Sequence, residues 1–293
     1  MTSIIHFIPL FSAMLYAFGA LGLKRSSDLG CGLWRAAFVL NLVTALAYQP
    51  LWLLGGTFHA DKLWQPVVIA VCYVFGQTLS LVSLERGDVS VATPVLGVKI
   101  LLVAVFITLL GGERVTALFW VAAGLSTAAI VLLNRRSNSS QHRHVGLTIV
   151  TAFLSAAAFA LFDVLLRKWS PEWGVGVFLP LVLTMVAVAS FGFIPLFHAP
   201  LRAMDRKVWP WLLGGSALLS LQSVLFVSTV AAYGNVTAAN IMFSSRGLWS
   251  VVIVWFGGHW FSNREQNLGG GILRWRLAGA VLMMAAIVLV LMK

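Results

Sequence analysis

Two basic residues, Lys99 and Arg246, stand almost at the centre of long apolar stretches of the sequence. A lone cation at the middle of a bilayer costs about 2.5–3.5 kcal/mol on insertion scales. Neither side chain can reach the membrane surface, which lies about 15 Å away at a helix rise of about 1.5 Å per residue. We therefore expect both charges to serve a ligand, to pair with a buried carboxylate, or to face a water-filled cavity.

An anion is the ligand that these two cations fit best. An arginine offers a planar fork that matches a carboxylate or a phosphate, while a lysine acts as a point charge. Asn240, Ser244 and Ser245 lie just before Arg246, and Trp249 follows it by one helical turn. The Trp249 ring is placed to stack on a planar ligand or on the guanidinium, with plain packing as its alternative role. We predict that these residues and Lys99 bind substrate.

Polar residues of two other apolar stretches are candidates for the same site. Tyr73, Gln77 and Ser80 recur at helical spacing, and Gln222 and Ser223 interrupt a later stretch. Hydrogen bonding between helices is the alternative role for each of them. We predict Tyr73, Gln77 and Gln222 as further substrate-binding residues.

The competing interpretation is that buried carboxylates neutralise the two cations. Glu85, Asp88 and Glu113 lie at the ends of apolar stretches. Asp163 lies nearer a centre, but we expect it to pair with Arg167, four residues later on the same helix. With no acidic residue assigned to a membrane centre, we expect exchange or uniport rather than proton coupling.

The composition indicates which elements position these residues. Of the 293 residues, 60% are hydrophobic and 10% are charged, whereas soluble domains carry about 25% charged residues. Ten stretches approach the roughly 20 apolar residues of a spanning helix, and they lack the alternation of barrel strands. The sequence predicts an all-α membrane protein of ten transmembrane helices, with spans near 4–23, 34–54, 64–84, 90–111, 116–134, 146–166, 174–196, 209–232, 236–258 and 274–292.

The basic residues are spread over the loops, so the formal net charge of +11 does not indicate nucleic-acid binding. Most of them fall in the loops after odd-numbered spans, which predicts that those loops face the cytoplasm and that both termini face outward. The six histidines show no metal-ligand spacing, and Cys31 and Cys72 do not suggest a disulfide. We expect no metal and no cofactor, and either a monomer or a homodimer.

An internal repeat divides the chain. Ser12-Ala13 and Tyr16-Ala17 in the first span match Ser155-Ala156 and Phe159-Ala160 in the sixth at a constant offset. The sequence therefore predicts two five-helix domains, at residues 1–136 and 145–293, joined by a polar linker.

The repeat also relates the two central cations. Gly87–Ala92 matches Gly234–Ala239, and the offset between these segments equals that between Lys99 and Arg246. Because five is odd, the second domain must enter the membrane from the opposite side. Substrate sites of inverted-repeat transporters lie near the bilayer midplane, at the interface of the repeats.

The passage Gly111–Thr116, followed by a span that contains Ala122-Ala123-Gly124 and ends in Ala129–Leu133, resembles the helix-four-to-five signature of EamA-type members of the drug/metabolite transporter superfamily. The resemblance implies a secondary carrier in a bacterial-type inner membrane, with a central cavity between its two halves. Related sugar-phosphate translocators also place basic residues in their fourth and ninth helices. One departure is Pro94, which lies early in its span, whereas EamA-type members place a proline near the position of Lys99.

The expected function is secondary transport of a small metabolite that bears a carboxylate or phosphate, by alternating access. One alternative is an exporter of amino acids or other zwitterionic or neutral compounds. A flippase for a phosphate-headed lipid is a third, since it too would use buried cations. An enzyme is not expected, because no acid, base and nucleophile converge near the midplane.

Overall fold

The computed structural model describes residues 2–86, 92, 95–110, 115–133, 145–233, 236–257 and 270–291. These residues form helices joined by turns and short loops, and none of them lies in a strand. The predicted all-α membrane fold is confirmed, because each of the ten predicted spans contains a helix. The α-helices are α1 (Thr2–Asp28), α2 (Leu33–Tyr48), α3 (Trp64–Arg86), α5 (Lys99–Leu110), α6 (Ala117–Leu133), α7 (Val145–Trp173), α8 (Val175–Ser190), α9 (Val208–Tyr233), α10 (Val236–Phe243), α11 (Arg246–Gly257) and α12 (Gly270–Leu291).

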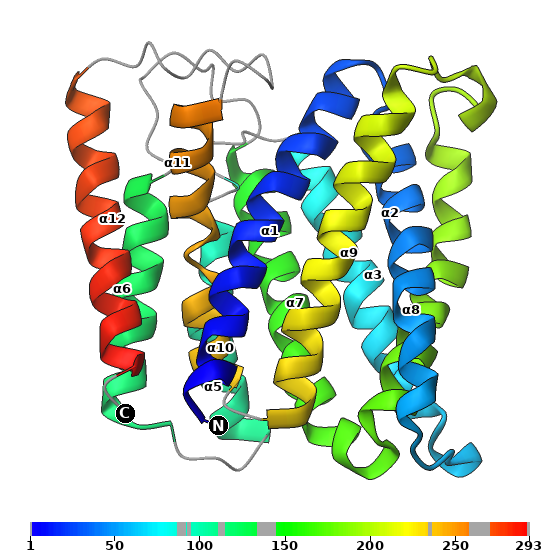
Figure 1. The fold of residues 1–293 in the computed structure, drawn as a ribbon, viewed down its shortest axis with the longest axis horizontal. Coiled ribbons are helices and arrows are strands. Elements are labelled where there is room, and N and C mark those ends of the chain that lie inside the picture. Colours follow the sequence, from blue (N-terminus) through cyan, green and yellow to red (C-terminus); the bar gives the residue numbers. More distant parts are fainter. Residues whose placement is uncertain are drawn as a thin grey trace.

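Six helical segments of the described residues are long and apolar enough to cross a membrane. Three shorter apolar helices, at Val95–Leu110, Ala117–Leu132 and Ala278–Val290, lie beside them. Figure 1 shows the helices side by side, with both ends of the chain at the same edge of the bundle. An even number of crossings requires that placement. The protein is therefore a multi-pass membrane protein.

Two predicted spans end in 3-10 helix instead of continuing as α-helix. These are η1 (Gln49–Leu54), which follows α2, and η3 (Phe191–Leu196), which follows α8. Each contains a proline, Pro50 or Pro195. Proline has no N–H to donate along an α-helix, and its ring clashes with the preceding turn. Two further 3-10 turns, η2 (Ala60–Lys62) and η4 (Leu201–Ala203), lie in the loops that follow.

The ninth predicted span, 236–258, is two helices rather than one. α10 ends at Phe243 and α11 begins at Arg246, with Ser244 and Ser245 in a turn between them. The Ser244 hydroxyl donates to the carbonyl of Ile241 at 2.5 Å, and the Ser244 amide also approaches that carbonyl at 3.2 Å. Serine hydroxyls that bond to nearby carbonyls compete with the helical ladder. The fourth span has a similar turn at Val98, directly before α5 begins at Lys99.

Close contacts between small residues hold the long helices together. α1 and α9 pack along each other, and a Cβ on Gly215 would lie 2.9 Å from the amide nitrogen of Leu23 and 3.0 Å from the carbonyl oxygen of Gly19. α3 and α7 also pack along each other, and the Ser155 hydroxyl donates to the Gly76 carbonyl at 2.7 Å. Small residues permit this approach of backbones in a membrane, where apolar burial alone gives little driving force.

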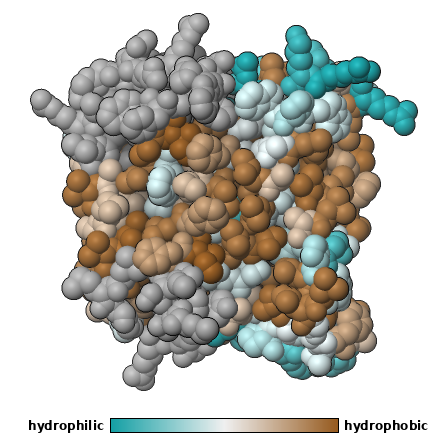
Figure 2. Space-filling model, in the orientation of Figure 1, coloured by the Kyte–Doolittle hydropathy of each residue, from teal (hydrophilic) through white to brown (hydrophobic). Residues whose placement is uncertain are grey.

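The outer surface matches a bilayer. Figure 2 shows an apolar band around the middle of the described surface, with hydrophilic residues gathered at its upper and lower edges. Large apolar side chains in this surface are well exposed, including Leu109 at 72% and Val71 at 60%. A soluble protein rarely leaves so many such side chains in contiguous patches. Lipid tails are the solvent that suits them.

Candidate functional site

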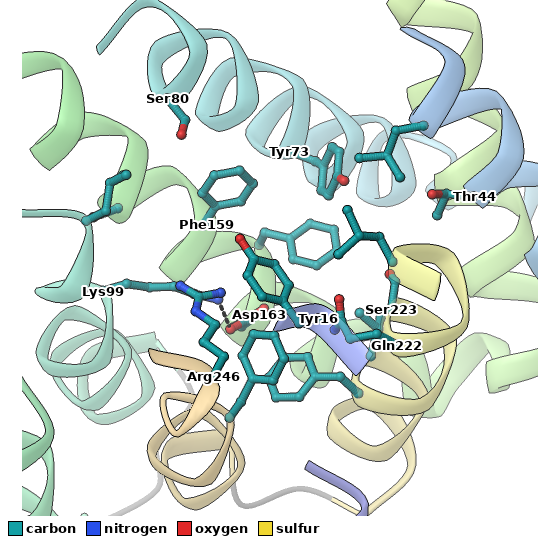
Figure 3. A pocket seen from close by; sticks show the side chains of 18 residues that line it. Tyr16, Thr44, Tyr73, Ser80, Lys99, Phe159, Asp163, Gln222, Ser223 and Arg246 are labelled. Atoms are coloured by element: carbon teal, nitrogen blue, oxygen red, sulfur yellow. Dashed lines mark ion pairs between the residues drawn. The ribbon is translucent and has the colours of Figure 1, made fainter. Parts of the chain in front are cut away.

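A cavity of about 290 Å³ lies among the helices, at the level of the two central cations. Its walls come from α1, α2, α3, α7 and α9, from the start of α5 with the turn before it, and from the junction of α10 and α11. Figure 3 shows Lys99 and Arg246 reaching into the same part of this space. The cavity therefore joins side chains from both of the predicted halves.

Lys99 forms an ion pair across this cavity with Asp163. The Lys99 Nζ lies 2.8 Å from the Asp163 Oδ2, and the Asp163 side chain is only 4% exposed. The Asn240 side chain donates to the same Oδ2 at 2.8 Å. The carboxylate is thus held from α5 and from α10 at once. A buried ion pair is stable when such extra hydrogen bonds satisfy its remaining lone pairs.

This pairing corrects two expectations from the sequence. Asp163 was expected to pair with Arg167, but Arg167 instead reaches towards the carbonyl of Ala231, at 3.5 Å. Asp163 is turned towards α5 because the neighbouring helix offers a lysine at the same depth. The second is that no acidic residue was assigned to a membrane centre, whereas Asp163 lines the cavity beside Lys99.

Arg246 lies against aromatic rings. Its guanidinium carbon is 4.7 Å from the centroid of the Tyr16 ring and 4.9 Å from that of Phe243. These two rings meet edge to face at 5.7 Å. A cation over an aromatic face is stabilised by the ring quadrupole, more strongly where water is scarce. The rings also fix the direction in which the guanidinium presents its donors.

Other predicted residues also reach the cavity. Tyr73 and Gln222 line it, as do Ser80 and Ser223. The Ser223 hydroxyl is 2.9 Å from that of Tyr48, which is fully buried. Figure 3 places Gln222 and Ser223 side by side on α9.

Five predicted residues do not line the cavity, and four of them have contacts that show their role. Asn240 stands behind the wall, where it supports Asp163. Gln77 exchanges two hydrogen bonds with Asn41 of α2, at 2.8 and 3.0 Å. Trp249 packs against the cluster of Ala17, Leu21 and Ile253. The Ser244 hydroxyl turns to the Met283 sulfur of α12, at 3.0 Å.

Ser245, the fifth, is 2% exposed and lies at the break before α11. Like the other four, it is absent from the cavity lining.

Sequence reasoning missed the aromatic walls. The cavity lining includes five aromatic residues that were not predicted: Tyr16, Phe159, Phe162, Phe226 and Phe243. A signal was available for two of them, because Tyr16 and Phe159 occupy matching positions in the internal repeat. A second signal was spacing. Ala156, Phe159 and Asp163 follow one face of α7 at intervals of three and four.

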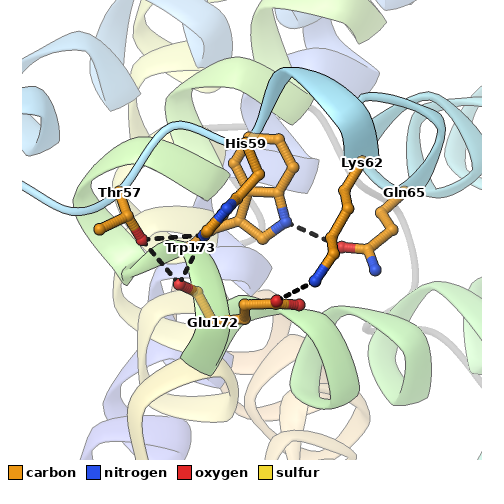
Figure 4. A network of polar contacts seen from close by, with 6 residues as sticks. All are labelled: Thr57, His59, Lys62, Gln65, Glu172 and Trp173. Atoms are coloured by element: carbon orange, nitrogen blue, oxygen red, sulfur yellow. Dashed lines mark hydrogen bonds and ion pairs between the residues drawn. The ribbon is translucent and has the colours of Figure 1, made fainter.

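A network of polar contacts, which we name the clasp, lies at the edge of the bundle that carries both termini (Figure 4). The Thr57 amide donates to the Trp173 carbonyl at 2.9 Å, and the Thr57 hydroxyl donates to the Glu172 carbonyl at 2.8 Å. The indole of Trp173, which is fully buried, donates to Gln65 at 2.8 Å. The clasp joins the loop after α2 to the end of α7, and consists of Thr57, His59, Lys62, Gln65, Glu172 and Trp173.

Comparison with known proteins identifies the fold family. Residues 3–135 match the model of the EamA-like transporter family. This part of the chain is similar to EamA-type transporters. The match indicates a membrane transporter of small molecules.

A solved structure has a similar fold over nearly the whole chain. A protein titled only "Crystal structure of protein" superposes with a TM-score of 0.73 at 15% sequence identity, over 98% of this chain and 96% of that one. At that identity the likeness shows the fold alone. Comparison with curated proteins gives no match.

Proposed function

We propose that this protein carries a small metabolite with an anionic group, and that Lys99 and Arg246 bind that group. The observation that supports this proposal is that Lys99 and Arg246 both line one cavity among the helices. Lys99 begins α5 and Arg246 begins α11, so each lies at the start of a helix that follows a turn. The partial positive charge of a helix start adds to the attraction of an anion.

Alternating access between two inverted five-helix repeats, 1–136 and 145–293, is the proposed mode of transport. The helix contacts support it. α1 packs along α9, and α3 packs along α7. In the expected repeat, α7 is the equivalent of α1, and α9 is the equivalent of α3. The two contacts are therefore equivalent to each other. In inverted-repeat transporters, equivalent helix contacts of this kind allow one group of helices to rock against the other around a substrate site at the bilayer midplane. The clasp would then be the closed gate at one end.

Asp163 favours a second candidate, an exporter of zwitterions. A carboxylate beside two cations would receive the ammonium of an amino acid while the cations hold its carboxylate. In this structure, however, Lys99 and Asn240 already occupy one oxygen of Asp163. An ammonium would have to displace one of those donors.

Uptake into proteoliposomes tests the proposal. Radiolabelled small carboxylates and phosphates should enter, and their neutral amides or esters should not. Arg246→Gln should reduce uptake by at least about thirtyfold. Removal of one partner from a desolvated charge contact costs at least about 2 kcal/mol of binding free energy, which corresponds to that factor. Ser244→Ala is the matched control, because Ser244 faces Met283 and lies two residues from Arg246. Equal uptake of acid and amide, or full uptake by folded Arg246→Gln, contradicts the proposal.

A further inference from the structure

The Asp163 carboxylate receives two donors on the same oxygen. The Lys99 ammonium lies 2.8 Å from Oδ2, and the Asn240 amide donates to that oxygen, also at 2.8 Å. The two donors differ in burial, because Asn240 is 3% exposed whereas the Lys99 side chain is 20% exposed and lines the cavity. Asp163 therefore has one partner within the helix packing and one partner in the cavity wall.

The two donors also differ in freedom of movement. The Asn240 amide donates to the Val236 carbonyl at 3.0 Å as well as to Asp163, so its short side chain is held at both contacts. Lys99 has a long flexible stem, and its ammonium carries several donors that can point in different directions. Rotation about the side-chain bonds can turn this ammonium from Asp163 towards a ligand in the cavity (Figure 3). Asp163 would then still keep its bond to Asn240.

Lys99 needs an anionic partner at this depth. A cation among membrane-spanning helices is costly unless it is paired. Asp163 supplies that partner from within the protein, with 2.8 Å between Nζ and Oδ2. The anionic group of a ligand offers the ammonium the same kind of contact. Asp163 and a ligand anion in the cavity can therefore replace each other on Lys99.

We propose that Asp163 is an internal competitor of the transported anion for Lys99. Lys99 binds Asp163 when the cavity holds no anion, and turns to the anionic group of the substrate when the substrate enters. Asn240 bonds to Asp163 in both situations. The competition lowers the affinity for the substrate and so assists its release, since a site that conducts must also let its ligand leave. This proposal rests on the proposed function, because it assigns Asp163 a role in the same site.

Binding of two small probes to the protein in lipid nanodiscs tests the proposal. Inorganic phosphate and acetate represent the two anionic groups. Asp163→Asn removes the competing charge and keeps the size of the side chain, so at least one probe should bind at least about tenfold more tightly than to wild type, a factor that corresponds to about 1.4 kcal/mol. Asp205→Asn is the control, because Asp205 lies in an exposed loop and accepts a hydrogen bond from the Lys207 amide. It should bind both probes as wild type does.

Variants of Lys99 separate competition from simple charge repulsion. Repulsion between Asp163 and an anion does not require Lys99, whereas competition acts only through the Lys99 ammonium. In a protein that already carries Lys99→Met, the further change Asp163→Asn should therefore leave the affinity for both probes unchanged. An equal gain in affinity from Asp163→Asn with and without Lys99 would overturn the proposal.

Infrared difference spectra of the wild-type protein test the proposal even where Lys99→Met fails to fold. The protein is prepared with isotope-labelled aspartate, and phosphate has no carboxylate band of its own. Addition of phosphate should shift an aspartate carboxylate band, because Oδ2 of Asp163 loses the Lys99 ammonium. Asp163→Asn should abolish the shift. Phosphate binding without any change in the aspartate bands would overturn the proposal.

The outcomes distinguish this proposal from the proposed function. If Arg246→Gln weakens binding of the probes but Asp163→Asn binds them as wild type does, Asp163 is only a structural partner of Lys99. The competition is then refuted and the anion site stands. If phosphate and acetate bind neither to wild type nor to Asp163→Asn, the proposed function fails and the competition fails with it.

Discussion

Lys99 of α5 and Asp163 of α7 form an ion pair, with 2.8 Å between Nζ and Oδ2, across the central cavity. The two residues come from different predicted halves of the chain. The pair therefore ties the halves together at the place where a substrate would bind. Any ligand that draws Lys99 towards itself changes this contact, which links substrate binding to the packing of α5 against α7.

Removal of Lys99 alone should destabilise the protein more than removal of the whole pair. Lys99→Met leaves the Asp163 carboxylate buried without its cation, which should lower the free energy of unfolding by about 3 kcal/mol. Addition of Asp163→Asn should recover most of that loss. Thermal unfolding in detergent, followed by tryptophan fluorescence, measures both. Equal melting temperatures of the single and double variants would show that the pair adds nothing to stability.

Gly215 should not tolerate a larger residue. Its Cβ would meet backbone atoms of α1, including the Gly19 carbonyl at 3.0 Å, and backbone cannot rotate away. Gly215→Ala should therefore destabilise the protein by about 1–3 kcal/mol, as overpacking does. Gly214→Ala is the control, since nothing lies within 4 Å of a Cβ at Gly214. Similar melting temperatures of the two alanine variants would refute the close approach of α1 and α9.

Gln77 should matter for stability and not for substrate. It bonds reciprocally with Asn41, which is 1% exposed. Gln77→Leu leaves the Asn41 amide without that partner, at a cost of about 1–3 kcal/mol, whereas Asn41→Leu/Gln77→Leu removes both groups and should be less harmful. Ligand affinity of the folded variants, measured in nanodiscs, should equal that of wild type. A large loss of affinity in the double variant would return Gln77 to the binding site.

The clasp should loosen when the charge of only one partner of its surface ion pair, Lys62 or Glu172, is reversed. Lys62→Glu faces Glu172 with a like charge, and Glu172→Lys does the same from the other side. Amide hydrogen exchange at Thr57, whose N–H bonds to Trp173, should then speed up a few-fold, in keeping with the small effect of exposed pairs. The exchange variant Lys62→Glu/Glu172→Lys should restore the wild-type rate. An unchanged rate in both single variants would show that the pair does not hold the clasp.

Hydropathy predicted the helices well because bilayer thickness fixes the length of a spanning segment. It predicted helix ends less well. α1 continues to Asp28 and α7 to Trp173, beyond the predicted ends at residues 23 and 166. Main-chain hydrogen bonds remain favourable where the side chains turn polar, so the end of an apolar run does not end a helix. The break at Ser244–Ser245 escaped prediction because the span remains apolar on both sides of it.

The sequence by itself determined the membrane class and the ten spans, since length and hydropathy along one helix set both. Only the tertiary structure decided that Lys99 meets Asp163, that Arg246 lies over Tyr16, and that Gln77 turns to Asn41 instead of the cavity. The physical reason is rotation about the helix axis. A helix that is apolar on nearly every face has no stripe to show which side points inward. Contacts with neighbouring helices set that rotation, and those contacts exist only in the folded bundle.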